Sequence, residues 1–207
     1  MFIDLLDVLG MIGTVSFAVS GALTALHRRF DLFGTLFLAA ITAIGGGVIR
    51  DILLGLTPPA AFTAPLGLVL SLGTALATFV VSGRYMKKHE LLVVYSDALG
   101  LGVFTATGAA RAYLVPDCNF FLVLMTGMFT GIGGGMLRDI LAQRTPFVLQ
   151  KEVYATASLA GALAFYLARH RLDFTAASYI CFFVTTGIRI AAIRYKLNVP
   201  HSKAPRP

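Results

Sequence analysis

Two pairs of opposite charges stand inside the most apolar parts of the chain. Arg50 and Asp51 follow a triple glycine in the segment IGGGVIRDIL, and Arg138 and Asp139 follow another in IGGGMLRDIL. Each charge near the centre of a membrane helix costs about 2.5–3.5 kcal/mol on insertion scales. Because neighbouring residues point about 100° apart on a helix, the spacing favours pairs between the two copies, Arg50 with Asp139 and Arg138 with Asp51. Such pairs would either lock the copies together as structural salt bridges or shape the electric field along an ion path.

The glycines before each charge pair favour a kinked or unwound helix. Unwound backbone is tolerated at membrane depth only where it is buried in protein or lines a water-filled cavity, and carbonyls freed there could coordinate a cation. We therefore predict an ion pathway beside Gly45, Gly46, Gly47, Gly133, Gly134 and Gly135. The alternative is that the glycines only let two helices pack closely.

Other polar residues extend the predicted pathway. Asp97 would concentrate cations near the inner mouth and Asp7 near the outer one, although a carboxylate early in a helix is also typical of macrodipole stabilisation. Thr105 and Thr107 offer hydroxyl oxygens to a permeating ion, or bond back within their own helix. Lys151 is a candidate gate at the cytoplasmic mouth, with an interfacial snorkelling lysine as the alternative.

These residues lie in a chain with the composition of a polytopic membrane protein. Hydrophobic residues make up 57% of its 207 residues and charged residues only 13%, about half the charge of a soluble domain, and the mean hydropathy is +0.81. Apolar segments long enough to span a bilayer predict seven transmembrane helices, at 5–26, 32–56, 65–83, 91–114, 119–142, 153–169 and 173–194.

We read the first segment as a spanning helix and not as a cleaved signal. Basic residues gather in alternate connections, which places the N-terminus outside and the C-terminus in the cytoplasm; Arg169 and Arg171 are the exception.

The two glycine segments belong to a longer internal repeat. Counting from Gly45 to Gly133 gives an offset of 133 − 45 = 88, and the register continues downstream. Upstream, once a short gap is allowed, the segment that begins at Asp7 resembles the one that begins at Asp97, so these two carboxylates are predicted to occupy matching positions. Each unit contains three predicted helices, so the second unit enters the membrane from the opposite side and the two are inverted. The predicted organisation is one all-α transmembrane domain (1–195) with repeat one (about 5–83), repeat two (about 91–169) and a seventh helix (about 173–194), followed by a basic cytoplasmic tail (196–207).

Motifs for other classes of protein are not found in the sequence. It contains no phosphate-binding glycine–lysine loop, no zinc-protease motif and no nucleophile elbow. Cys118 and Cys181 lie far apart and support neither a disulfide nor a redox motif. We expect no enzymatic activity, no cofactor and no metal site. The net charge of +7 is explained by membrane topology, so no nucleic-acid partner is expected.

Three stretches, GGGVIRDILLGLTPP, SDALGLGVFTATGA and GGGMLRDILAQRTPFVLQKEVYATASLAGAL, resemble a bacterial membrane family whose members are similar to the trimeric intracellular cation (TRIC) channels. The resemblance covers nearly the whole chain up to about Arg194. It implies two inverted three-helix repeats plus a seventh helix, a homotrimer with a potassium-permeable pore in each subunit, and a pore-bending role for the six glycines. The gating and lipid-binding roles of basic residues in the animal channels do not carry over to Lys151. The same family is also labelled as a transporter of glycine.

The function predicted from the sequence is a channel for monovalent cations in the bacterial inner membrane, surrounded by lipid and permeable to both potassium and sodium. Weak separation of these ions follows from the lack of a TVGYG-like filter. The alternative is a secondary transporter of a small amino acid such as glycine, in which Arg50, Arg138 and half-helix N-termini would hold the carboxylate.

Overall fold

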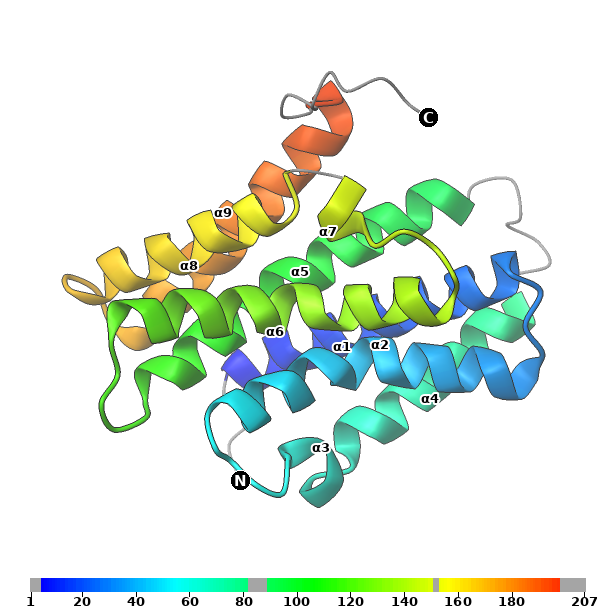
Figure 1. Ribbon diagram of the computed structural model, residues 1–207, viewed down its shortest axis with the longest axis horizontal. Helices are drawn as coiled ribbons and strands as arrows, with labels where there is room; N and C mark the ends of the chain where they lie inside the picture. Colours follow the sequence, from blue (N-terminus) through cyan, green and yellow to red (C-terminus); the bar gives the residue numbers. More distant parts are fainter. Residues whose placement is uncertain (1–4, 82–88, 151–152, 198–207) are drawn as a thin grey trace, which may run out of the picture.

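The computed structural model describes residues 5–81, 89–150 and 153–197, and over these residues all of its regular structure is helical (Figure 1). The predicted segments are matched closely by seven helices, namely α1 (Leu5–His27), α2 (Leu32–Leu53), α4 (Leu66–Val81), α5 (His89–Tyr113), α6 (Phe120–Leu141), α8 (Ala155–Arg169) and α9 (Phe174–Tyr195). The sequence pattern does not predict the two short helices α3 (Ala60–Thr63) and α7 (Phe147–Gln150), which follow α2 and α6. Helices α1, α2, α5, α6 and α9 are long and apolar enough to cross a membrane, whereas α4 and α8 have 16 and 15 residues.

Several helices begin at a side-chain cap. The carboxylate of Asp31 accepts a hydrogen bond from the Gly34 N–H at the start of α2 (2.7 Å), and Asn119 does the same for Leu122 at the start of α6 (2.9 Å). Asp173 caps α9. These short polar side chains satisfy amide groups that lack a partner within the helix, which explains why the helices begin where the apolar segments do.

Helices α1, α2, α5 and α6 form the centre of the molecule. Each is in extensive contact with two of the others, in the cyclic order α1, α2, α6, α5. Helix α4 packs against α1 and α2, α8 packs against α5 and α6, and α9 covers α8 and α5 (Figure 1). The triplets α1–α2–α4 and α5–α6–α8 therefore have the same internal pattern of contacts.

The outer surface is apolar and much of the interior is polar. Large hydrophobic side chains are exposed on α2, α4 and α9, among them Phe33, Phe37, Val69, Val80 and Phe183. Buried charged residues include Asp51, Asp97, Arg138, Asp139 and Arg189. Exposed apolar faces of this extent need a nonaqueous partner, and charges on membrane helices face the bundle interior, so the distribution is that of a membrane protein.

The triple glycines do not interrupt their helices. Both α2 and α6 are continuous α-helix through the glycine segments, so the predicted unwinding is wrong in this conformation. The glycines instead let the two helices touch. A Cβ atom at Gly46 would collide with the carbonyl oxygen of Thr130, and one at Gly134 with the carbonyl oxygen of Thr42. Close packing, the alternative interpretation, is what the structure bears out for these two residues.

A second reciprocal contact joins α1 and α5. A Cβ at Gly13 would lie 2.6 Å from Val103 Cγ1 and 3.4 Å from the ring of Phe104, and one at Gly100 would collide with the ring of Phe17. Phe17 and Phe104 stack with their ring centroids 5.0 Å apart. The offsets 100 − 13 and 104 − 17 both equal 87, so this pair of helices follows almost the same register as α2 and α6.

This register corrects one predicted correspondence. With an offset of 87, the residue that matches Asp97 is Gly10 (97 − 87), whereas the sequence comparison, which allows a short gap, pairs Asp97 with Asp7. The reciprocal glycine contacts fix the register more firmly than the similarity of two carboxylates does. The first triplet therefore has no carboxylate at the position of Asp97.

Candidate functional site: a buried charge cluster

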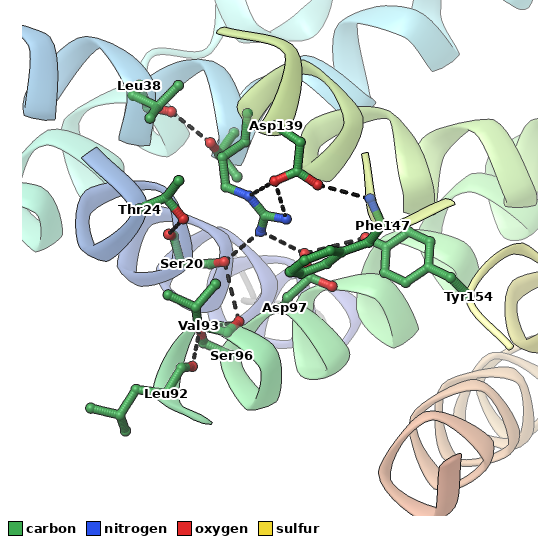
Figure 2. Close-up of polar contacts among 12 residues, drawn as sticks. Ser20, Thr24, Leu38, Leu92, Val93, Ser96, Asp97, Asp139, Phe147 and Tyr154 are labelled. Carbon is green, nitrogen blue, oxygen red and sulfur yellow. Dashed lines mark hydrogen bonds and ion pairs between the residues drawn. The ribbon is translucent and has the colours of Figure 1, made fainter. Parts of the chain in front are cut away.

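Arg138 is the centre of a cluster of polar side chains from α1, α5 and α6. It lies in the last turn of α6 and its side chain is fully buried, as is that of Asp97. Its Nη1 donates hydrogen bonds to Ser20 Oγ on α1 (2.5 Å) and to Asp97 Oδ1 on α5 (2.7 Å) (Figure 2). The Ser20 hydroxyl donates in turn to the carbonyl oxygen of Val93 (3.3 Å). A guanidinium can make such contacts in several directions because its five N–H groups are fixed in a plane, and here it ties three helices together.

Asp139 holds the other side of the same guanidinium. Arg138 Nε donates to Asp139 Oδ1 (2.9 Å), and Nη2 lies 2.9 Å from the same oxygen. The second oxygen, Oδ2, accepts a hydrogen bond from the Phe147 N–H at the start of α7 (3.0 Å). The ring of Phe147 lies 4.9 Å from the Arg138 Cζ atom. Asp139 therefore connects the charge cluster to the short helix that follows α6.

Tyr154 completes the cluster from the N-terminal end of α8. Its hydroxyl donates to Asp97 Oδ1 (3.2 Å), the oxygen that also receives Arg138. The other carboxylate oxygen, Asp97 Oδ2, is buried and has no hydrogen-bond partner within the described residues. The cluster thus sets one guanidinium against two carboxylates, and one carboxylate oxygen is left unsatisfied in a low-dielectric interior where its charge acts strongly.

The first triplet carries a reduced version of this site. Arg50 Nε donates to Asp51 Oδ1 (2.8 Å), and Asp51 Oδ2 accepts from the Ala60 N–H at the start of α3 (2.8 Å). The local motif is the same in both copies: an arginine, the next aspartate, and the first amide of a short helix. The side chain of Arg50, however, is 13% exposed, and its ion-pair partner in the described structure is Asp51.

The predicted pairs Arg50–Asp139 and Arg138–Asp51 are therefore wrong. Each arginine binds the aspartate that follows it. The 100° separation is overcome because the arginine stem is long enough to fold back along the helix, and because the amide of a short helix holds the aspartate in place from the opposite side.

The remaining predicted site residues fall into different surroundings. A Cβ at Gly45 would meet Leu137 and one at Gly133 would meet Ile49. Gly47 and Gly135 lie beside the guanidinium groups, with Cβ positions 3.8 Å from Arg50 Nη2 and 3.7 Å from Arg138 Nη2.

The two threonines of α5 differ from each other. Thr105 Oγ1 lies 2.6 Å from Ser158 Oγ on α8, and the pair is buried. Thr107 bonds back to the Phe104 carbonyl oxygen (3.3 Å), as the alternative interpretation has it. Lys151 lies outside the described residues. Cys118 and Cys181 are both free thiols.

Four residues around Arg138 are not singled out by the sequence patterns, namely Ser20, Phe147, Tyr154 and Arg189. A hydroxyl or an aromatic ring in an apolar segment gives no distinctive signal. Arg189 does give one, because it is a charge inside a predicted spanning segment, where a charge marks a functional position by default. Its guanidinium lies over the ring of Tyr154, with 4.9 Å between Cζ and the ring centroid.

The buried ion cluster and the apolar exterior define, over the described residues, an all-helical membrane protein with two triplets of helices that share one pattern of contacts. Residues 7–83 and 94–170 each match the family described as Glycine transporter. The inner membrane protein YadS (UPF0126) of Escherichia coli K12 is 38% identical over 196 residues, which cover 93% of each chain. The chain belongs to this family.

Solved structures of TRIC channels are similar to the whole fold. One, from work on conductance through TRIC cation channels, is 36% identical with a TM-score of 0.89 and covers 99% of this chain and 100% of its own. The TRIC orthologue from Rhodobacter sphaeroides is 33% identical with a TM-score of 0.87, and the match covers 93% of this chain and 98% of that one. The chain is thus a bacterial membrane protein of the TRIC fold.

Proposed function

We propose that this protein is a potassium-permeable channel for monovalent cations, with one pore in each protomer of a homotrimer. The observation that carries the proposal is an unsatisfied carboxylate oxygen in the Arg138 cluster. Asp97 Oδ2 is buried without a hydrogen-bond partner in the described part of the chain, between the central helices of a fold whose solved relatives are cation channels. A buried carboxylate oxygen without a hydrogen-bond partner is a ligand that suits a hard cation and repels chloride.

The pathway proposed here runs between α1, α2, α5 and α6. Its proposed oxygen ligands are Asp97, Thr105 and Thr107; in the described conformation Thr105 pairs with Ser158 and Thr107 bonds back to Phe104, so both hydroxyls would have to turn to meet an ion. The six glycines would line this path, and Gly46 and Gly134 bring α2 and α6 into contact. Gly47 and Gly135 border the two guanidinium groups. Coordination by the carbonyls of unwound glycines would require a conformation other than the continuous helices described above.

We further propose that the described conformation is closed. Asp97 and Arg138 are both fully buried, so an ion can reach Asp97 only if the contacts from Arg138 or Tyr154 separate. A tyrosine hydrogen bond of 3.2 Å is weaker than the charged contact of 2.7 Å and is the one expected to break first. Lys151 remains a candidate gate at the cytoplasmic mouth.

The membrane arrangement proposed is seven spanning helices as two inverted repeats, α1–α2–α4 and α5–α6–α8, plus α9, in one transmembrane domain. Two observations support it. The same family matches the chain twice, at an offset of 94 − 7 = 87 residues, and the glycine contacts are reciprocal, as a two-fold relation between the halves requires. The distribution of basic residues supports an N-terminus outside and a basic tail (196–207) in the cytoplasm.

Transport of a small amino acid such as glycine is the second candidate function, and the description of the matching family favours it. A carrier needs free donors for the substrate carboxylate. Within the four central helices, Arg138 is already bound to Asp97, Asp139 and Ser20, so the half-buried Arg50 is the better carboxylate ligand there. Among the described residues Arg189 has free donors, but it lies on α9, outside the central helices. The geometry therefore fits a channel better than a carrier.

Reconstitution into planar bilayers tests the proposal. We expect unitary currents in symmetric KCl, a reversal potential on the cation side under a KCl gradient, and only weak separation under K⁺/Na⁺ bi-ionic conditions. Asp97→Asn should lower cation-over-chloride selectivity, while Asp117→Asn, at an exposed loop position, should not. Glycine-dependent flux into liposomes without unitary currents would assign the protein to the carriers instead.

A further inference from the structure

A second buried arginine has no carboxylate partner among the described residues. Arg189 lies on α9 and is 2% exposed. Its Nε and Nη2 atoms are buried without a hydrogen-bond partner, and the contact described for its guanidinium is the ring face of Tyr154. Arginine remains protonated inside proteins, so this is a buried positive charge for which, within the described residues, the recorded contact is an aromatic ring. Such a charge is strongly unfavourable unless an opposite charge joins it.

Arg189 also lines a cavity. The cavity has a volume of about 440 Å³ and lies between the N-terminal end of α5 and the C-terminal end of α9. Glu90 and Lys196 line it as well, and the rest of the wall is mostly aliphatic, including Leu91, Val94 and Ile193. Glu90 and Lys196 are both exposed and carry opposite charges, so they cancel at the wall of the cavity and leave Arg189 as its net charge.

The shape and lining indicate the class of ligand. A chloride or a lone carboxylate would fill only a small part of 440 Å³, and nothing in an aliphatic wall would hold the surrounding water in place. A phosphate group joined to an organic body would place its oxygens beside the guanidinium, where charge-assisted hydrogen bonds are strongest, and its carbon atoms against Leu91 and Ile193.

We propose that this cavity is a binding site for a phosphate ester, with Arg189 as its principal ligand. The ester can be the headgroup of a membrane phospholipid or a soluble phosphate monoester, because both present the same oxygens. The site lies on α5 and α9, away from the glycines of α2 and α6, and does not depend on the proposed ion conduction.

The test measures binding to the purified, delipidated protein directly. Thermal stability is followed in detergent with glycerol 3-phosphate, and in nanodiscs of phosphatidylglycerol against nanodiscs of a lipid with a sugar headgroup and no phosphate. We expect the wild-type protein to be stabilised by at least one phosphate source and Arg189→Gln to bind it about tenfold more weakly or worse. Arg194→Gln removes the same charge from an exposed position on the same helix and should change binding less than twofold.

The detergent and nanodisc measurements distinguish a soluble phosphate ester from a lipid headgroup. Stabilisation by glycerol 3-phosphate in detergent assigns a soluble ester, and stabilisation by phosphatidylglycerol alone assigns a lipid headgroup. A second variant, Val94→Phe, fills the cavity while Arg189 is retained, and it should abolish binding without removing a charge. No stabilisation from either source, or equal loss in Arg189→Gln and Arg194→Gln, would overturn the proposal.

Discussion

The Arg50 and Arg138 sites have the same local construction and different surroundings. Both arginines bind the aspartate that follows them, and both aspartates accept the first amide of a short helix. Arg138 then gains Asp97 and Ser20 and becomes fully buried, while Arg50 stays 13% exposed. The difference comes from the neighbouring helix, which has Asp97 on α5 and Gly10 at the matching position of α1. The Arg50 site is therefore a local motif within one helix and its following loop, and the addition of Asp97 from α5 makes the Arg138 site a buried charge cluster.

The largest expected effect comes from removing the arginine of the buried site. Arg138→Ala leaves Asp97 and Asp139 buried without a counter-charge and should destabilise the protein by about 3–5 kcal/mol. Arg50→Ala should cost less, about 1–3 kcal/mol, because it leaves one buried carboxylate, Asp51, without its counter-charge and not two, and Asp51 keeps its hydrogen bond from Ala60. Unfolding in detergent, measured side by side, checks the difference. Equal losses would show that burial does not distinguish the two sites.

The two arginine sites are expected to differ, whereas the glycine contacts between α2 and α6 are expected to be equally sensitive to substitution in both halves. Gly46→Ala and Gly134→Ala each place a methyl group against a backbone carbonyl of the facing helix, which has no side chain to move aside. We expect each change to destabilise the protein by about 1–3 kcal/mol, and by similar amounts. A Leu at either position should disrupt the fold and would not simply block conduction.

Gly73→Ala is the matched control for the glycine substitutions. Gly73 is in the interior of α4, and a Cβ there meets nothing within 4 Å. Alanine should be neutral or should stabilise that helix by up to about 1 kcal/mol. Thermal melts of the three variants measure these changes in stability. A large difference between Gly46→Ala and Gly134→Ala would contradict the reciprocal packing.

Tyr154 belongs to the Arg138 site, and no tyrosine contact is described at the Arg50 site. Tyr154→Phe removes the hydroxyl that donates to Asp97 Oδ1 and keeps the ring beneath Arg189. We expect a loss of about 1 kcal/mol in stability and a higher open probability in bilayer recordings, because one contact that closes the cluster is gone. An unchanged open probability would remove Tyr154 from the proposed closing contacts.

The sequence predicts the helices well because each apolar segment and its capping residue act locally. The seven long helices, the repeat and the TRIC resemblance all follow from short-range patterns of this kind. The ion pairs and the effect of the glycines could not be predicted in the same way. Whether Arg138 reaches Asp97 or Asp51 depends on helix packing, and a triple glycine is equally suited to unwinding and to close contact until the facing helix is placed.

The smallest expected effect comes from building the missing carboxylate into the first half. Gly10 matches Asp97 in the register, and a Cβ there meets no other atom within 4 Å, so Gly10→Asp can be accommodated. If the halves are equivalent, the new carboxylate reaches Arg50 as Asp97 reaches Arg138 and stabilises the protein by about 0.5–1 kcal/mol, the range of a pair that remains partly exposed. The measurement is a double-mutant cycle of Gly10→Asp with Arg50→Ala, since only the coupling between the two isolates the new pair. Gly73→Asp, which adds the same charge at another open position, should show no coupling to Arg50. Zero coupling for Gly10→Asp would mean that the two halves diverge in geometry as well as in sequence.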